Sequence, residues 1–195
     1  KMKSFTSKPY SVTTLSQIAD KSVAALVLQN NKVLRSVDDV AQFEKLQKLV
    51  ADDNQLESIH IPSHAKLAYL SASLNRIASV ALPPQMSVLI LGQNRIYSLE
   101  FCRGLAHLRH LDVSSNPVSV LCPLLGLRLQ YLNIKGTNVT NARQLRFVTA
   151  KKVDTDLGVS NEMQKEETKK IVDFAVDREA IVEQMLKTWS RKQIK

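Results

Sequence analysis

The segment LAYLSASLNRI, residues 67–77, decides the fold, because its spacing of leucine, asparagine and aliphatic residues recurs on both sides of it. The shared pattern is L-x-x-L-x-L-x-x-N-x-L, with other aliphatic residues replacing some leucines. It recurs as VAALVLQNNKV (23–33), LQKLVADDNQL (46–56), MSVLILGQNRI (86–96), LRHLDVSSNPV (108–118) and LQYLNIKGTNV (129–139). This recurrence predicts a stack of short, similar units.

Each position of the pattern has a physical role. The L-x-L centre alternates with period two, so it predicts a short strand with one buried and one exposed face. After the strand the chain must turn sharply, and a buried asparagine can satisfy both an N–H and a C=O group there. Aliphatic residues that follow, such as Val37, Val40 and Phe43, are expected to face the core from a return segment. The asparagine position is filled by Asn31, Asn54, Asn75, Asn94 and Asn116, and then by Thr137.

The pattern over about residues 10–155 resembles the leucine-rich-repeat family. Its roughly 22-residue unit is similar to the subtype found in the nuclear regulator of protein phosphatase one, the spliceosomal A-prime protein and an axonemal dynein light chain. The resemblance implies an α/β solenoid, a leucine-rich-repeat horseshoe with one parallel concave β-sheet, short return segments and helical caps. The family is a versatile scaffold, so it implies binding without naming the partner.

Three parts follow from this interpretation. Residues 1–22 are an N-terminal extension with a capping helix, predicted from Val12, Leu15 and Ile18. Residues 23–155 are leucine-rich repeats, six plus a degenerate seventh whose core segment is LRFVTAKKV at 145–153. Residues 156–195 are expected to contain a long helix, because Asn161 to about Lys192 lacks Gly and Pro and keeps helical spacing of apolar residues. That helix either caps the array or docks a partner.

The residues between the core leucines should point out of the concave face. Three of the ten aromatic residues fall on one row there, next to aliphatic residues and with polar borders. This composition is typical of an interface, although β-propensity alone also favours Val, Ile and Tyr on strands. We expect a protein partner that includes an acidic or helical segment. The predicted protein-binding residues are Tyr69, Val88, Ile90, His110, Asp112, Tyr131, Phe147 and, on the C-terminal helix, Trp189.

The formal net charge of +9 is unevenly distributed. Between His60 and Lys152 there are eleven Lys or Arg residues and two acids, which favours an acidic partner, either protein or nucleic acid. The alternative function is therefore an RNA-associated subunit of a ribonucleoprotein complex, with Tyr131 and Phe147 stacking on bases. The spaced arginines fit a solvated outer surface somewhat better. The residues of this alternative are Arg128, Arg143, Arg146, Lys151 and Lys152.

The sequence contains no catalytic motif, so we expect no enzyme, no metal and no cofactor. The histidine pairs His60/His64 and His107/His110 lack a carboxylate or cysteine at ligand spacing. The apolar stretch 77–94 is interrupted by two prolines and is not expected to span a membrane. Two cysteines are too few for a disulfide framework, and no signal-peptide pattern is present. We therefore expect reduced, buried thiols and an intracellular location, cytoplasmic or nuclear, with the cytoplasm slightly preferred.

Overall fold

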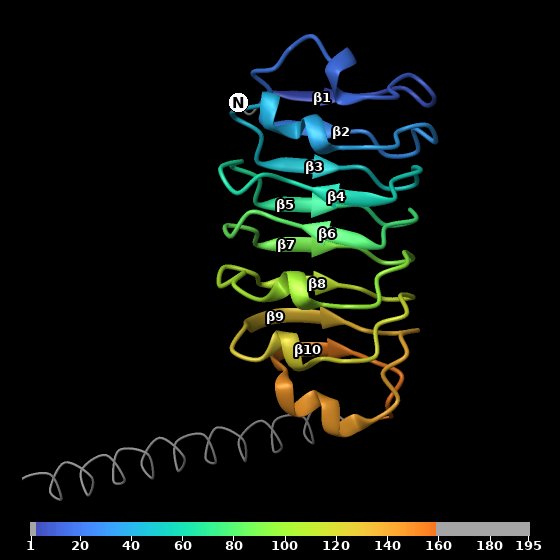
Figure 1. Cartoon of the computed structure of the whole chain (residues 1–195), viewed down its shortest axis with the longest axis vertical. Helices are drawn as coiled ribbons and strands as arrows, with labels where there is room; N and C mark the ends of the chain where they lie inside the picture. Colours follow the sequence, from blue (N-terminus) through green and yellow to red (C-terminus); the bar gives the residue numbers. More distant parts are fainter. Residues whose placement is uncertain (1–2, 159–195) are drawn as a thin grey trace, which may run out of the picture.

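The computed structural model describes residues 3–158 and confirms the predicted solenoid (Figure 1). Eight parallel strands form one sheet in the order β1-β2-β3-β5-β7-β8-β9-β10, so each strand pairs with strands of the adjacent copies. In Figure 1 these strands are stacked from the N-terminal to the C-terminal end in chain order. Their bounds are Ser4–Thr6 (β1), Ala25–Val27 (β2), Lys48–Val50 (β3), Tyr69–Ser71 (β5), Val88–Ile90 (β7), His110–Asp112 (β8), Arg128–Asn133 (β9) and Thr149–Asp154 (β10).

The central leucines form one continuous column inside the solenoid. Strand pairing aligns the central residue of each short strand with its equivalent in the next copy, so these side chains stack directly. Every member of the column is completely buried, which confirms the predicted inward face of the strands. The column consists of Leu26, Leu49, Leu70, Leu89, Leu111 and Leu132.

The return segments close the core on the opposite side. Four of them contain a short 3-10 helix: Asp38–Gln42 (η2), Glu100–Cys102 (η3), Cys122–Leu124 (η4) and Ala142–Phe147 (η5). The other two contain Ser58–His60 (β4) and Ser79–Ala81 (β6), which pair as a second, two-stranded parallel sheet. Val37, Val40 and Phe43 are buried in the first return segment, as predicted.

Each asparagine of the repeat pattern links its own copy to the preceding one. The side-chain oxygen of Asn94 accepts a hydrogen bond from the N–H of Ile77 at 2.9 Å, and its nitrogen donates to the C=O of Ala72 at 2.9 Å. Equivalent pairs of bonds are made by Asn31, Asn54, Asn75 and Asn116. The predicted role is confirmed, and its partners lie in the neighbouring copy. We call these four residues, together with Asn94, the asparagine ladder.

The turn before each ladder asparagine requires a left-handed backbone. The residue that precedes the asparagine has a positive φ in every copy, and only Gly136, before Thr137, is a glycine. Leu74 is the least suited of these residues, because its Cβ is crowded at a φ of 57° while its side chain is 51% exposed. The sequence pattern of leucines and asparagines contains no signal for this position. The other members are Asn30, Asp53, Gln93 and Ser115.

The N-terminal extension differs from the prediction. Residues 4–6 form β1 and pair with β2, so the sheet begins before the first recognised copy. The expected capping helix over 11–20 is a single 3-10 turn, Leu15–Gln17 (η1), although Val12, Leu15 and Ile18 are buried as predicted. Residues 4–18 thus act as an incomplete extra copy. This copy does not match the repeat pattern, because Tyr10 occupies the position where the spacing requires an asparagine.

The register of the seventh copy was also wrong. Leu145 lies in η5, on the return segment, and the pairing aligns Ala150 with Leu129 and Val153 with Leu132. The reason is that Leu145 and Val148 repeat, 21 residues later, the return-segment positions of the preceding copy rather than its strand. The predicted long C-terminal helix lies outside the described residues.

Candidate functional site

The face of the eight-stranded sheet that is not packed on the core is here called the open sheet face. It carries five of the predicted protein-binding residues, here called the strip: Tyr69, Val88, Ile90, His110 and Tyr131. Its first row aligns Lys48, Tyr69, Val88, His110 and Tyr131 on successive strands. Its second row aligns Val50, Ser71, Ile90, Asp112 and Asn133 by the same pairing. Both rows match the predicted order up to β9. His110 is exposed, while Tyr69, Val88, Ile90, Asp112 and Tyr131 are half-buried.

Tyr69 is partly covered by a neighbouring strand. The ammonium group of Lys48 lies 4.5 Å from the centre of its ring, within the range of a cation–π contact. Partial burial, with a smaller contribution from the nearby Asp52 carboxylate, raises the pKa of the Tyr69 hydroxyl. The ring is therefore held in place before any partner arrives.

Tyr131 has a similar cover at the other end of the strip. Lys152 lies 5.3 Å from its ring centre, and its hydroxyl donates to Asp154 Oδ2 at 2.7 Å. Burial and this hydrogen bond raise the pKa of Tyr131 to about 12. Lys152 also forms an ion pair with Asp154 at 3.5 Å. Asp154 is a site residue that the repeat pattern did not predict, because the predicted register of the seventh copy did not pair it with Asn133.

Asp112 is held by its neighbours on the open sheet face. Its Oδ1 accepts bonds from the backbone N–H and the hydroxyl of Ser114, and its Oδ2 accepts from Asn133 at 2.9 Å. Gly92 fits beside this group, since a Cβ there would lie 2.9 Å from the Ser114 hydroxyl oxygen. The carboxylate is thus fixed in orientation, and its charge still reaches the half-buried surface.

One predicted protein-binding residue on the described part of the chain, Phe147, does not lie on the open sheet face. Phe147 ends η5 on the return segment, and Lys152 occupies its expected place in the first row. The guanidinium of Arg146 lies 4.7 Å from the Phe147 ring centre, so the two side chains contact each other. Trp189 lies outside the described residues.

The five residues of the RNA alternative are divided between two surfaces. Arg143 and Arg146 are exposed on η5, while Lys152 lies in the first row of the open sheet face. Lys151 is exposed on β10, and Arg128 is exposed where β9 begins. The structure therefore does not bring the predicted basic set together into one patch.

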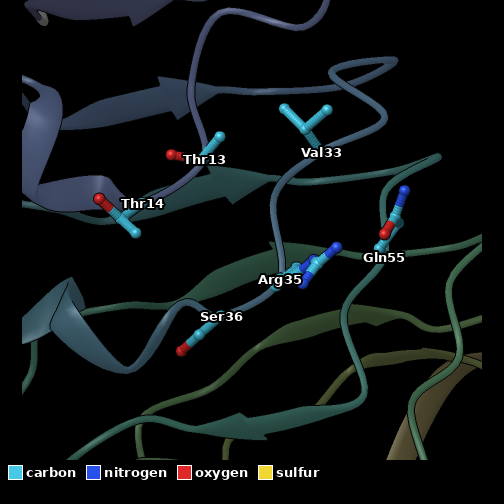
Figure 2. A pocket seen from close by; sticks show the side chains of 6 residues that line it. All are labelled: Thr13, Thr14, Val33, Arg35, Ser36 and Gln55. Atoms are coloured by element: carbon cyan, nitrogen blue, oxygen red, sulfur yellow. The ribbon is translucent and has the colours of Figure 1, made fainter.

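A pocket of about 400 Å³ lies near the N-terminal end, away from the strip (Figure 2). Figure 2 shows that the lining side chains come from three segments of the chain. Polar side chains of the lining form hydrogen bonds within the protein. The Gln55 amide donates to the backbone of Lys32 at 2.7 Å, and the Ser36 hydroxyl accepts from the Asp38 N–H at 3.0 Å. The lining residues are Thr13, Thr14, Val33, Arg35, Ser36 and Gln55.

Across residues 3–158, no group of three or more His, Cys, Asp or Glu side chains is arranged to hold a metal ion. No helix in the same range is long and apolar enough to cross a membrane. Cys102 is buried, and burial raises the pKa of its thiol, whereas Cys122 is only half-buried rather than buried as expected.

Comparison with known proteins gives partial likenesses. No protein-family model matches the chain. Mouse nephrocan is 36% identical over 122 residues, a match that covers 58% of this chain and 24% of nephrocan, so the matched region is about a quarter of that protein. The crystal structure of an internalin C2 from Listeria monocytogenes aligns with 62% of this chain and 52% of its own, at 22% identity and a TM-score of 0.47. The recurring motif, the parallel sheet and the asparagine ladder give this chain the fold of a leucine-rich-repeat solenoid.

Proposed function

We propose that this chain is a non-catalytic adaptor that binds a protein segment on its open sheet face. The observation that carries the proposal is the strip formed by Tyr69, Val88, Ile90, His110 and Tyr131. These five side chains come from four adjacent strands, yet none of them is fully buried. A row of apolar and aromatic side chains that the fold does not need for its own core has the composition of an interface.

The covers on the two tyrosines support the same function. Rings held by Lys48 and Lys152 lose little conformational freedom on binding, which reduces the entropic cost of association. Aromatic residues that are rigid and partly exposed are frequent binding hot spots. Tyr69 and Tyr131 are therefore the proposed anchors, with Val88 and Ile90 between them.

The finer assignments belong to this proposal as well. We assign the chain to the 22-residue subtype named above on its repeat length, and we place it inside the cell, preferably in the cytoplasm. The RNA-associated role is the less favoured function, since its basic residues are divided between the return segment and the sheet. The whole-protein functions of nephrocan are not transferred, since the match covers 24% of it.

The test begins with a pull-down by the full chain, with an RNase-treated control, and mass spectrometry of the bound proteins. Partner affinity and unfolding are then measured for Tyr69→Ala and Tyr131→Ala. Each should weaken binding by about 2 kcal/mol or more, and each should lower the free energy of unfolding by less than the truncation of a core leucine does. Tyr97→Ala is the matched control, because Tyr97 is 68% exposed and lies outside the strip.

Leu91→Ala calibrates the opposite behaviour. Leu91 is completely buried, so its truncation should lower the free energy of unfolding by about 2–5 kcal/mol. If Tyr69→Ala and Tyr131→Ala fold normally and bind as tightly as Tyr97→Ala, the partner does not use the open sheet face and the proposal fails.

A further inference from the structure

Basic residues recur, one copy after another, where the chain enters the strands of the sheet. The residues three positions before the first row are Lys45, Lys66, Gln85, His107 and Arg128 in successive copies. All except Gln85 are exposed, and the Gln85 amide is used in a hydrogen bond to the backbone of Ala65. We call Lys45, Lys66, His107 and Arg128 the basic rim.

The basic rim runs across the strands at the edge where they begin. Adjacent parallel strands lie about 4.8 Å apart, so the rim extends over roughly 19 Å from Lys45 to Arg128. Within the described residues, no ion pair involves Lys45, Lys66 or Arg128. The acid nearest in sequence is the exposed Glu44, beside Lys45. The rim therefore presents three exposed Lys and Arg side chains that form no ion pair within the described residues.

The charge of the open sheet face changes across its rows. The first row, next to the rim, carries Lys48 and Lys152, whereas the second row carries Asp112 and Asp154. Alternate residues of a strand are about 6.6 Å apart, so Asp112 lies beside His110 and Asp154 beside Lys152. The basic rim and the carboxylates of Asp112 and Asp154 therefore lie on opposite sides of the first row.

We propose that the basic rim binds an acidic polypeptide segment that continues from the partner seated on the open sheet face. The proposal names the chemistry of that partner and rests on the proposed function. Carboxylates complement exposed Lys and Arg side chains, and such rim charges mainly accelerate and orient association. Single-stranded RNA is the less suitable occupant, because base stacking needs free aromatic faces and both first-row tyrosines carry a lysine.

The test uses the full chain and two labelled probes, a 20-residue poly-glutamate peptide and a 20-nucleotide poly-uridine. The rim variant is Lys45→Glu, Lys66→Glu and Arg128→Glu together. The control variant is Arg35→Glu, Arg76→Glu and Arg95→Glu, which reverses three exposed arginines that follow the asparagine turns at the other side of the sheet. Both variants lower the net charge of +9 by the same amount. Binding is measured by fluorescence anisotropy at low and at physiological salt.

The wild-type chain should bind poly-glutamate in a salt-sensitive manner, and the rim variant should lose about tenfold or more in affinity while the control changes little. Equal losses in both variants would show a simple net-charge effect and overturn the proposal. Tight binding of poly-uridine without poly-glutamate binding would assign the rim to nucleic acid instead. If the rim variant loses affinity for poly-glutamate while Tyr69→Ala and Tyr131→Ala bind the partner as tightly as the wild-type chain, the proposed function is refuted and the rim proposal stands.

Discussion

Replacement of Asn94 by alanine tests the asparagine ladder most directly. The side-chain nitrogen of Asn94 donates to three carbonyl groups, and its oxygen accepts from the N–H of Ile77. All three carbonyls keep another donor after the change: Ala72 is also bonded by Asn75, Leu91 by Asn116, and Gly92 by the N–H of Leu74. The principal loss is therefore one buried N–H without an acceptor. We expect Asn94→Ala to lower the free energy of unfolding by about 1–3 kcal/mol.

The assay is urea unfolding followed by circular dichroism, with Asn138→Ala as the control. Asn138 is an exposed asparagine that follows Thr137 and does not belong to the ladder, so its replacement should change the free energy of unfolding by less than about 0.5 kcal/mol. If Asn94→Ala and Asn138→Ala unfold at the same urea concentration, the inter-copy bonds do not stabilise the array and the reasoning is refuted.

Asn94→Asp adds a pH dependence to the same test. A carboxylate at this position would face the carbonyl oxygens of Ala72 and Leu91, which raises its pKa in the folded state. The folded variant then binds a proton more tightly than the unfolded chain, so its stability should rise as the pH falls. The free energy of unfolding of Asn94→Asp should fall furthest below that of Asn94→Ala near neutral pH, and this difference should shrink as the pH is lowered. A pH-independent difference in urea midpoint would contradict this.

Three further predictions concern single positions. Leu74→Asn should raise the free energy of unfolding by about 0.5–1 kcal/mol, because asparagine tolerates the left-handed backbone that Leu74 adopts, and a lower melting temperature would count against strain there. Gly92→Ala should cost about 1–3 kcal/mol through its clash with the Ser114 hydroxyl, and adding Ser114→Ala should restore part of that loss in the same melts. Asp154→Asn should lower the pKa of Tyr131 from about 12 towards 10.0 in a tyrosinate absorbance titration. Because that pKa is raised by folding, the contribution of Tyr131 to stability should be complete below pH 10.0 and lost as the pH approaches 12, and an unchanged titration would exclude the hydrogen bond as a cause.

The sequence predicts this architecture well where the repeat pattern is complete. Period-two alternation around a central leucine determines which side chains are buried, so the repeat pattern alone aligns Tyr69, His110 and Tyr131 in one row, as the strand pairing confirms. The asparagine role was also predictable, because a sharp buried turn leaves backbone groups that a side-chain amide can satisfy.

The prediction was wrong where the alignment relied on leucine identity rather than on distance along the chain. Leu145 resembled the first residue of a new copy, yet it lies 21 residues after Leu124, which belongs to the preceding return segment. Phe147 was assigned to the strip for this reason, and Lys152 and Asp154 were missed. Contacts such as Lys48 with Tyr69 were harder to predict, because they depend on how two long side chains lie across neighbouring strands.

The asparagine ladder has a consequence for how such a chain changes over evolution. Each ladder asparagine bonds only to its own copy and to the one before it, so the unit that can be inherited or lost without damage is a complete copy. If a gene lost the codons for residues 55–75, Arg76 and Ile77 would follow Asn54 as they now follow Asn75. Asn94 would then still accept a hydrogen bond from the N–H of Ile77. Loss of one codon within a strand would instead move every later side chain of that strand to the opposite face. Duplication and deletion should therefore proceed in steps of whole copies, with the length of the open sheet face changing while its rows remain aligned.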